Sequence, residues 1–301
     1  MGKLLIIDGE NLLHRSFHKF KNLKTSDGEP TGAIFGFFKS LHYLVFRFQS
    51  DQVMVTFDNG HSKFRTKVLP TYKSHRKNIS MDYESLQKQK KVIMRILKNL
   101  NIGYIYDKKR THTYEGDDYI AWLVKNHKGK SLIVSSDKDF CQLLNKNIKI
   151  FNPSKDALIT EQNCLEIMGY SGSECVDYLS LLGDSSDDIP GYKGLGEVKV
   201  RQFLNTWKSI SNFLNDLNNT HPGVNRDTMG SVYSTNKMMI DLDYFIKAHP
   251  LKELPIVNNK KGAINIDKLN KIFMRYSLTS FRSKEFLSTF QKLKPWQKSC
   301  S

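Results

Sequence analysis

The residues of this sequence best suited to chemistry are carboxylates, which gather in five short motifs. The motifs are Asp8, Asp58, Glu115-Gly-Asp117-Asp118, Asp137-Lys-Asp139 and Gly183-Asp184-Ser-Ser-Asp187-Asp188. Carboxylates packed together repel one another unless a cation neutralises them. No set of histidines or cysteines accompanies these acids, so an all-oxygen site for Mg²⁺ or Mn²⁺ is the chemistry that they indicate.

The spacing within the motifs supports a shared site. Glu115 and Asp118 lie three residues apart, as do Asp184 and Asp187, and that spacing places both members of a pair on one face of a helix. A single acid after a strand is often a turn residue or a helix cap. That interpretation stays open for each motif alone, whereas five motifs together favour a metal site.

The charge balance points to the partner. The chain has 301 residues, with 46 Lys and Arg against 30 Asp and Glu, for a formal net charge of +16. A hydrophobic content of 39% indicates a globular chain rather than a disordered basic tail. The positive excess favours a polyanion, although simple solubility would also explain it. Acidic metal sites in basic proteins suit phosphodiester chemistry, in which two cations roughly 4 Å apart hold the attacking and leaving oxygens.

Other classes of protein are disfavoured. No apolar run approaches the ~18 residues of a membrane span, and the N-terminal apolar run is too short for a signal peptide. The four cysteines show no zinc-ligand spacing, so we expect reduced thiols rather than disulfides.

The elements expected to position the acids alternate between strands and helices in the first half of the chain. We expect strands at residues 3–7, 53–57, 103–106, 132–134 and 148–151, and helices at 31–48, 82–100 and 117–124. This alternation predicts an α/β fold with a mainly parallel sheet. Asp8, Asp58 and Asp137 follow three of the strands, at the carboxyl ends where such sheets bind ligands. Later helices are expected at 161–169, 172–182, 196–206, 208–217, 231–247, 266–275 and 281–292.

Two further segments suggest contacts with nucleic acid. Residues 61–80 interleave basic and aromatic side chains, a pattern that fits single-strand binding, although a solvated charged loop has the same composition. Residues 191–199 form a glycine-rich entry to a helix, where backbone N–H groups can hold a phosphate.

Taken together, these motifs resemble the flap endonuclease / 5′-nuclease family, which includes stand-alone phage and bacterial enzymes and the N-terminal domain of bacterial DNA polymerase I. Residues 183–196 match the family signature Gly-Asp-x-x-Asp-Asn-Ile-Pro-Gly-x-x-Gly-x-Gly, and residues 114–118 and 136–140 match its other acidic motifs. The resemblance spans about residues 3 to 210. Two departures are Asp188, where the family usually has Asn, and Gly116, where it usually has Ala.

The resemblance implies a PIN-like catalytic domain over residues 1–180, with a helical arch at about 61–100. It also implies a helical C-terminal region over 181–301, with a duplex-binding helix–two-turn–helix element at about 184–215. K⁺ is a candidate ligand of that element.

The resemblance also assigns roles to individual residues. The implied metal ligands are Asp8, Asp58, Glu115, Asp117, Asp118, Asp137, Asp139, Asp184 and Asp187. The implied catalytic residues are Lys73, Arg76, Asp8, Asp58 and Asp118. The implied DNA contacts are Arg65, Tyr72, Lys73, Arg76, Lys193, Gly194, Gly196 and Lys199.

The function implied is a structure-specific 5′ nuclease, with flap endonuclease and 5′→3′ exonuclease action on DNA through two or more Mg²⁺ or Mn²⁺ ions. We expect a monomer in the cytoplasm of a bacterial or phage-infected cell, with no membrane contact and with any polymerase partner on a separate chain. Two alternatives stay open: a PIN-like ribonuclease, and a nucleic-acid-binding protein without catalysis.

Overall fold

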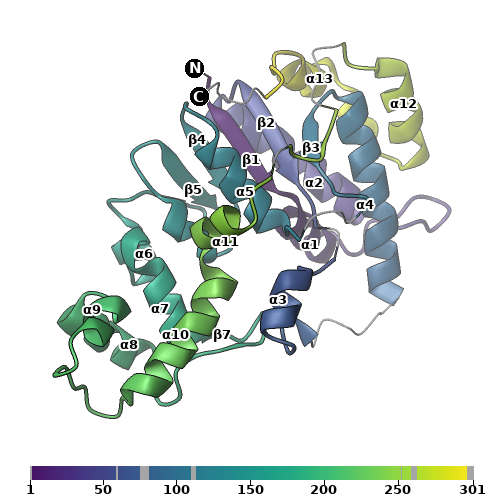
Figure 1. The fold of residues 1–301 in the computed structure, drawn as a ribbon. Helices are drawn as coiled ribbons and strands as arrows, with labels where there is room; N and C mark the ends of the chain where they lie inside the picture. Colours follow the sequence, from purple (N-terminus) through teal and green to yellow (C-terminus); the bar gives the residue numbers. More distant parts are fainter. Residues whose placement is uncertain are drawn as a thin grey trace.

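The central element of the fold is a twisted sheet covered on both faces by helices (Figure 1). The computed structural model describes residues 2–58, 60–74, 81–109, 113–251, 253–258 and 263–296. Within these residues the sheet has seven strands in the order β6-β5-β4-β1-β2-β3-β9. The strands are β1 (Leu4–Asp8), β2 (Gln52–Thr56), β3 (Gly103–Ile105), β4 (Ser131–Val134), β5 (Ile148–Asn152), β6 (Ala157–Ile159) and β9 (Ile256–Val257). Strands β1 to β5 run parallel and the two edge strands antiparallel, which confirms the predicted α/β class.

Alternate residues of each strand face two separate hydrophobic cores. Leu5 and Ile7 of β1 belong to one core, while Leu4 and Ile6 belong to the other. Every residue of β1 is buried, because helices cover both faces of the sheet and an unbroken apolar strand is then stable. The core of Leu5 and Ile7 is built with α1 (Gly9–Lys19), α2 (Gly32–Phe48), α4 (Met81–Asn99), α12 (Ile266–Arg275) and α13 (Lys284–Gln291).

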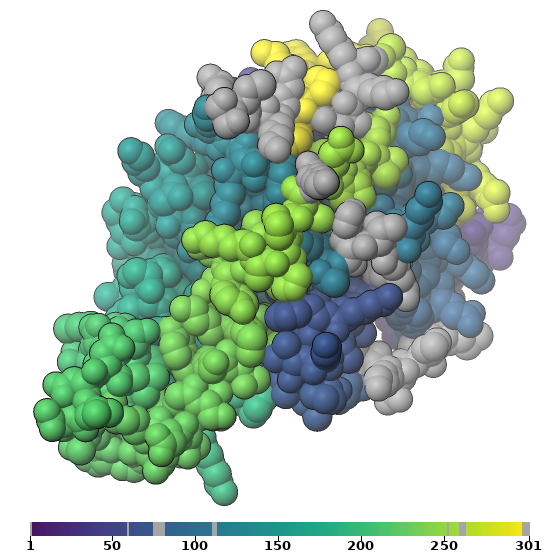
Figure 2. All heavy atoms as spheres, in the orientation of Figure 1, coloured from purple at the N-terminus to yellow at the C-terminus, as the bar shows by residue number. Residues whose placement is uncertain are grey.

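The second core extends from the sheet into a helical lobe. It is built with α5 (Gly116–Lys125), α6 (Cys164–Met168), α7 (Cys175–Leu182), α8 (Glu197–Trp207), α9 (Ile210–Asn215), α10 (Arg226–Ile240) and α11 (Leu242–Ala248). Figure 2 shows the green helices of this lobe projecting from the body of the molecule, next to the dark blue segment that contains α3 (Lys63–Val68). Contacts between α3 and α10 join the two parts.

Several elements differ from the sequence prediction, among them α3 and β6, which were not predicted. The helix predicted over residues 231–247 is two helices, because the Asp241 side chain accepts the Tyr244 N–H at 2.9 Å and caps α11. Helix α1 was not predicted, and it begins where Asp8 accepts the Asn11 N–H at 3.0 Å.

The C-terminal part of the chain returns to the sheet. Strand β9 pairs with β3, and the Lys294 N–H donates to the Asp51 carbonyl at 2.8 Å beside the start of β2. Helices α12 and α13 pack on α4 and α2. Residues 256–257 and the elements within 263–296 therefore share the sheet's core, and the expected boundary at residue 180 does not separate them from it.

A two-stranded hairpin follows α7 and carries the last acidic motif. Strand β7 (Gly183–Asp184) pairs with β8 (Ile189–Pro190). Gly183 has a φ of 79°, and a Cβ there would lie 2.3 Å from the Gly191 nitrogen. Only glycine combines this conformation with so close an approach of backbone.

We therefore expect Gly183→Ala to lower the free energy of unfolding by about 2–4 kcal/mol, from backbone strain and overpacking together. Denaturant unfolding measures the change. Gly194→Ala is the matched control, because Gly194 also has a positive φ but a Cβ there would meet no atom within 4 Å. Equal losses in the two variants would show that the close approach contributes nothing.

Candidate metal and nucleic-acid site

Parallel pairing brings the first acidic motifs to one edge of the sheet. Asp8 pairs with Thr56, two residues before Asp58, and Ile7 pairs with Val134, three residues before Asp137. The three aspartates thus leave the sheet at the same carboxyl edge, as their positions in the sequence predicted. Asp117 approaches this edge from the first turn of α5.

Asp8 is held rigidly at this edge. One carboxylate oxygen caps α1, and the other accepts the Ser135 Oγ–H at 2.6 Å. Burial raises the pKa of Asp8 to about 7, with Asp137 and Asp58 adding to the rise. A positive charge placed beside this carboxyl group would therefore stabilise its ionised form.

Asp117, Asp137 and Asp139 show the same raised pKa. Burial raises the pKa of Asp117, and Asp137, Asp8 and Asp58 raise it further. Burial likewise raises the pKa of Asp139, which Asp137 and Asp184 reinforce. Burial raises the pKa of Asp137 too, and Asp187 and Asp184 raise it further, so the hairpin acids act on the strand-end acids. The aspartates that share this field are Asp8, Asp58, Asp117, Asp137, Asp139, Asp184 and Asp187.

This set of donors fits divalent cations in kind. All its ligand atoms are carboxylate oxygens, which Mg²⁺ and Mn²⁺ prefer, and their mutual repulsion is the energy that a bound cation would relieve. Within the described ranges, however, no three acidic, histidine or cysteine side chains are arranged so that they could hold an ion as they stand. Several carboxylates already accept protein hydrogen bonds, as Asp58 does from the Gly116 N–H. Ion binding therefore requires side-chain adjustment.

A divalent cation is accordingly expected to stabilise the protein without DNA. At a Mg²⁺ or Mn²⁺ concentration about 100-fold above Kd, the gain in the free energy of unfolding is about 2.7 kcal/mol. A thermal melt in Mg²⁺ should therefore lie above one in chelator at the same ionic strength, set with NaCl. Identical melts would contradict a cation site among these acids.

Glu115 and Asp118 are placed differently from the expectation. Arg65 binds both oxygens of Asp118 at 2.8 Å, in the two-pronged geometry that guanidinium and carboxylate share. The Glu115 carboxylate accepts bonds from Lys73 at 3.0 Å and from the Ser62 N–H at 2.7 Å. Burial would raise the pKa of Glu115, but Lys73 and Arg65 outweigh it and lower the pKa to about 2. In this structure both acids balance buried cations, so neither offers free oxygens to a metal.

The structure does not support the predicted DNA contacts of Arg65 and Tyr72, because both side chains are buried. Arg65 is 3% exposed and Tyr72 6%, and the Tyr72 hydroxyl donates to Glu115 at 2.7 Å. In this arrangement Arg65 cannot meet a phosphate and Tyr72 cannot stack on a base. Lys73 is also only 6% exposed, so it can act on a phosphate here only through its charge and not by direct contact. The alternating pattern of residues 61–80 could not reveal this, because a cation that faces solvent and one that faces a buried carboxylate look alike in sequence.

Lys73 lies between the two groups of acids. Its ammonium is 3.0 Å from Glu115 and 3.6 Å from Asp187, and its backbone N–H donates to the Asp187 carbonyl at 3.0 Å. Lys73 has a φ of 53°, a left-handed conformation that is uncommon for a residue other than glycine. Such strain often marks a functional position. Arg76, the other predicted catalytic cation, lies outside the described residues.

The hairpin acids are fixed by local hydrogen bonds. Asp184 accepts the Ser186 N–H at 2.8 Å and pairs with Lys138 at 3.2 Å. Burial raises its pKa, but the Ser186 hydroxyl and Lys138 outweigh burial and leave the pKa lowered.

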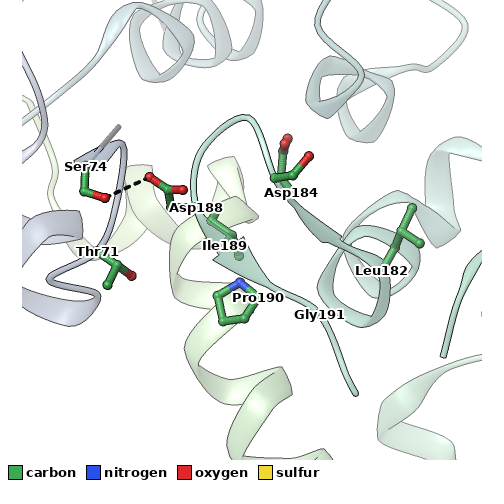
Figure 3. A pocket seen from close by; sticks show the side chains of 9 residues that line it. Thr71, Ser74, Leu182, Asp184, Asp188, Ile189, Pro190 and Gly191 are labelled. Carbon is green, nitrogen blue, oxygen red and sulfur yellow. Dashed lines mark hydrogen bonds between the residues drawn. The ribbon is translucent and has the colours of Figure 1, made fainter. Parts of the chain in front are cut away.

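A cavity of about 560 Å³ lies between this hairpin and the turn at residues 71–74 (Figure 3). On its wall, Ser74 donates to Asp188 at 3.2 Å. Asp188, with a φ of 56°, occupies a left-handed conformation that Asn and Asp tolerate best. Since both residue types tolerate this conformation, Asp188 can occupy the position where the flap endonuclease / 5′-nuclease family usually has Asn.

The predicted duplex contacts lie on the lobe rather than among the acids. Lys193, Gly194, Gly196 and Lys199 are all exposed at the start of α8. Gly194 and Gly196 have open space where a side chain would stand, so another backbone can approach closely. All four residues are thus accessible, and their contact with duplex DNA stays a prediction.

Three polar residues of the site escaped the sequence prediction. Buried Lys90 of α4 contacts Glu10 and donates to the Asp58 carbonyl at 2.7 Å. Ser135 holds Asp8, and Lys138 pairs with Asp184. Ser135 and Lys138 could have been identified from the sequence, because they lie next to the acidic motif of Asp137 and Asp139. Lys90 lies in a helix without any acidic motif nearby, so nothing in the sequence indicated its role.

Comparison with known proteins shows the family of this chain. Residues 3–169 match the family described as 5′-3′ exonuclease, N-terminal resolvase-like domain. A 5′-3′ exonuclease from Aquifex aeolicus (strain VF5) is 30% identical over 294 residues, which cover 93% of this chain and 99% of the relative. The chain belongs to the 5′-3′ exonuclease family. As a member of this family, it also aligns with the thermostable DNA polymerase I of Thermus aquaticus, at 34% identity over 226 residues, which are 74% of this chain and 26% of the polymerase.

Solved structures of other nucleases share the family's fold. A T5 5′-exonuclease with bound divalent metal ions (zinc) matches with a TM-score of 0.65 at 18% identity, over 93% of this chain and 100% of that chain. The catalytic core of Rad2 in complex with DNA substrate matches with a TM-score of 0.57 at 18% identity, over 96% and 92% of the two chains. At these identities the likeness extends to the fold alone. None of the helices in the described ranges is both long and apolar enough to cross a membrane.

Proposed function

We propose that this member of the 5′-3′ exonuclease family is a structure-specific 5′ nuclease that hydrolyses DNA phosphodiester bonds near a 5′ end or flap junction. The observation that carries the proposal is that seven aspartates share one electrostatic field, and that four of them, Asp58, Asp117, Asp137 and Asp187, also interact with Lys73. The chain around them has a net charge of +16. The names of the Aquifex relative and of the nuclease structures support the same activity.

The aspartates would hold the cations of the reaction. Asp8, Asp58 and Asp117 form one side of the proposed site, and Asp137, Asp139, Asp184 and Asp187 the other. Bound Mg²⁺ or Mn²⁺ would supply Lewis acidity for attack on the phosphodiester and for departure of the leaving group. Glu115 and Asp118 would act through the cations Lys73 and Arg65 that they hold.

Lys73 would stabilise charge on the phosphate. Its ammonium lies between Glu115 and Asp187, and buried Glu115 keeps it protonated by raising its pKa against the effect of burial. A fixed positive charge near a phosphate counts most where water is excluded. Arg76 is proposed as its partner on the basis of the motif alone.

Duplex binding is proposed for the exposed start of α8. Gly194 and Gly196 leave open space in which a phosphate could approach the backbone N–H groups, and Lys193 and Lys199 lie close to them in the sequence. Such contacts go to the phosphate backbone and are insensitive to base sequence. Binding should therefore weaken steeply as salt rises. K⁺ at this turn is part of the proposal.

One gel tests the proposed function. The substrates are an end-labelled 5′-flap, a blunt duplex, a single strand and a matched RNA flap, each incubated with and without Mg²⁺. We expect Mg²⁺-dependent release of a short product from the DNA flap. Preference for the RNA flap would favour a PIN-like ribonuclease, and retention without cleavage would favour a binding protein.

A further inference from the structure

Helix α10 lies beyond residues 3–169, the part that matches the family, yet it contacts residues that hold acids of the site. Two acidic groups are meant here: the hairpin pair Asp184 and Asp187, and the α5 acids Glu115, Asp117 and Asp118. It packs along α7, whose end leads into the hairpin of Asp184 and Asp187. It also packs against α3, which carries Arg65 (Figure 1). Sequence patterns assign this helix no role beyond filling a helical region.

Asn236 of α10 fixes the hairpin. Its side chain is 1% exposed, and its amide nitrogen donates to the Ser180 carbonyl at 2.8 Å and to the Pro190 carbonyl at 2.7 Å. Ser180 lies in the last turn of α7, where carbonyls lack partners within the helix. Pro190 pairs with Gly183, the neighbour of Asp184. One amide group thus joins the end of α7 to the strand that faces Asp184.

Arg65 meets the same helix one turn later. Its Nε–H donates at 3.0 Å to the carbonyl of Met239, in the last turn of α10. The rest of the guanidinium binds Asp118 and lies 3.5 Å from Glu115. Its carbon centre stands 4.4 Å from the centre of the Phe245 ring on α11. All these contacts are buried, so the guanidinium has one position.

These contacts link the two acidic groups through a single turn of helix. Asn236 and Met239 are three residues apart and therefore neighbours on the helix surface. One holds the hairpin of Asp184 and Asp187, and the other holds Arg65 with Glu115 and Asp118. Lys73 also lies between these two groups, with Glu115 on one side and Asp187 on the other.

We propose that α10 is a positioning element that sets the spacing between the two acidic groups of the site, through Asn236 at one group and through the Met239 carbonyl and Arg65 at the other. This inference rests on the proposed function, because the spacing matters for cations and phosphate held between the groups. It assigns to the helical region a part in catalysis separate from its part in duplex binding.

Asn236→Asp is the main test, because the substitution keeps the shape of the side chain and removes both N–H donors. Loss of a supporting partner of a metal ligand typically costs about 10–100-fold in metal affinity or activity. We expect a loss of that size in Mn²⁺ affinity by calorimetry and in kcat on a 5′-flap, with KM and metal-free DNA affinity unchanged. Ser234→Asp is the matched control, since it adds the same charge at an exposed position of α10 and should behave as wild type.

A second variant tests the other end of the link. Arg65→Lys keeps the positive charge but cannot bind Asp118 with two prongs while donating to Met239. We expect it to lower Mn²⁺ affinity and kcat as Asn236→Asp does. If Asn236→Asp does not fold, Asn236→Ser, which keeps one donor, takes its place under the same criteria.

The outcomes separate the inference from the proposed function. Folded variants at both positions with wild-type Mn²⁺ affinity and wild-type kcat would overturn the inference alone. A wild-type protein that binds Mn²⁺ but cleaves no flap would overturn the proposed function, while the calorimetric comparison would still decide the role of α10. A wild-type protein that binds no Mn²⁺ would overturn both.

Discussion

Replacing both Asp184 and Asp187 with asparagine is expected to reduce cleavage of a 5′-flap by at least ~100-fold. Removing a residue that only supports a metal ligand already costs up to about 100-fold, so removing two ligands should cost at least as much. Asparagine keeps the shape of each side chain and an oxygen that can accept the Ser186 bonds. The double variant therefore removes two negative charges from the site with little change in the hairpin. The expected defect is in the chemical step.

DNA binding should survive in this variant. The substitutions do not touch the exposed start of α8. Removing two negative charges also lowers the repulsion between the protein and the phosphate backbone, so it should not weaken binding. Single-turnover cleavage measures the chemical step, and fluorescence anisotropy in chelator measures binding. Asp188→Asn is the matched control, because it neutralises the adjacent acid while its amide oxygen can still accept the Ser74 bond. Cleavage by the double variant at the rate of this control would contradict a metal role for the hairpin.

The position of the acidic edge could be predicted from sequence because it depends only on local patterns. A buried apolar run that ends in Asp is visible in the chain, and parallel pairing then brings Asp8, Asp58 and Asp137 to one edge. The main helices and strands, including α2, α4 and α12, were also predicted within about two residues, since their apolar periodicity is strong. The hairpin motif was identified by its resemblance to the family signature.

The partners of the acids could not be predicted in the same way. Arg65 and Asp118 are 53 residues apart, and Asn236 and Ser180 are 56 apart. The local sequence does not distinguish an arginine whose guanidinium is buried in an ion pair from one that is exposed and binds a phosphate. The energetic logic appears only in three dimensions, where an unpaired buried charge is too costly to persist. Arg65, Tyr72 and Glu115 thus changed role once their surroundings were known.

Lys73→Met should produce a comparable loss in the chemical step for a different reason. Methionine has nearly the length of lysine and removes only the ammonium that stands between Glu115 and Asp187. Loss of a fixed charge that stabilises a transition state typically costs about 10²–10³-fold in rate. We expect that loss in single-turnover cleavage, with Mg²⁺ saturating and flap affinity within a few-fold of wild type.

The stability of the variant distinguishes catalysis from folding. Breaking a buried ion pair from one side costs about 3–5 kcal/mol when the remaining charge is left alone. Glu115 keeps Arg65, Tyr72 and the Ser62 N–H, so the loss in the free energy of unfolding should be smaller. Lys67→Met, at an exposed position of α3, removes the same charge and should change only the salt dependence of binding. If Lys73→Met is folded and cleaves as fast as the Lys67 variant, the ammonium serves only to balance Glu115, and the charge that acts on the phosphate must come from elsewhere.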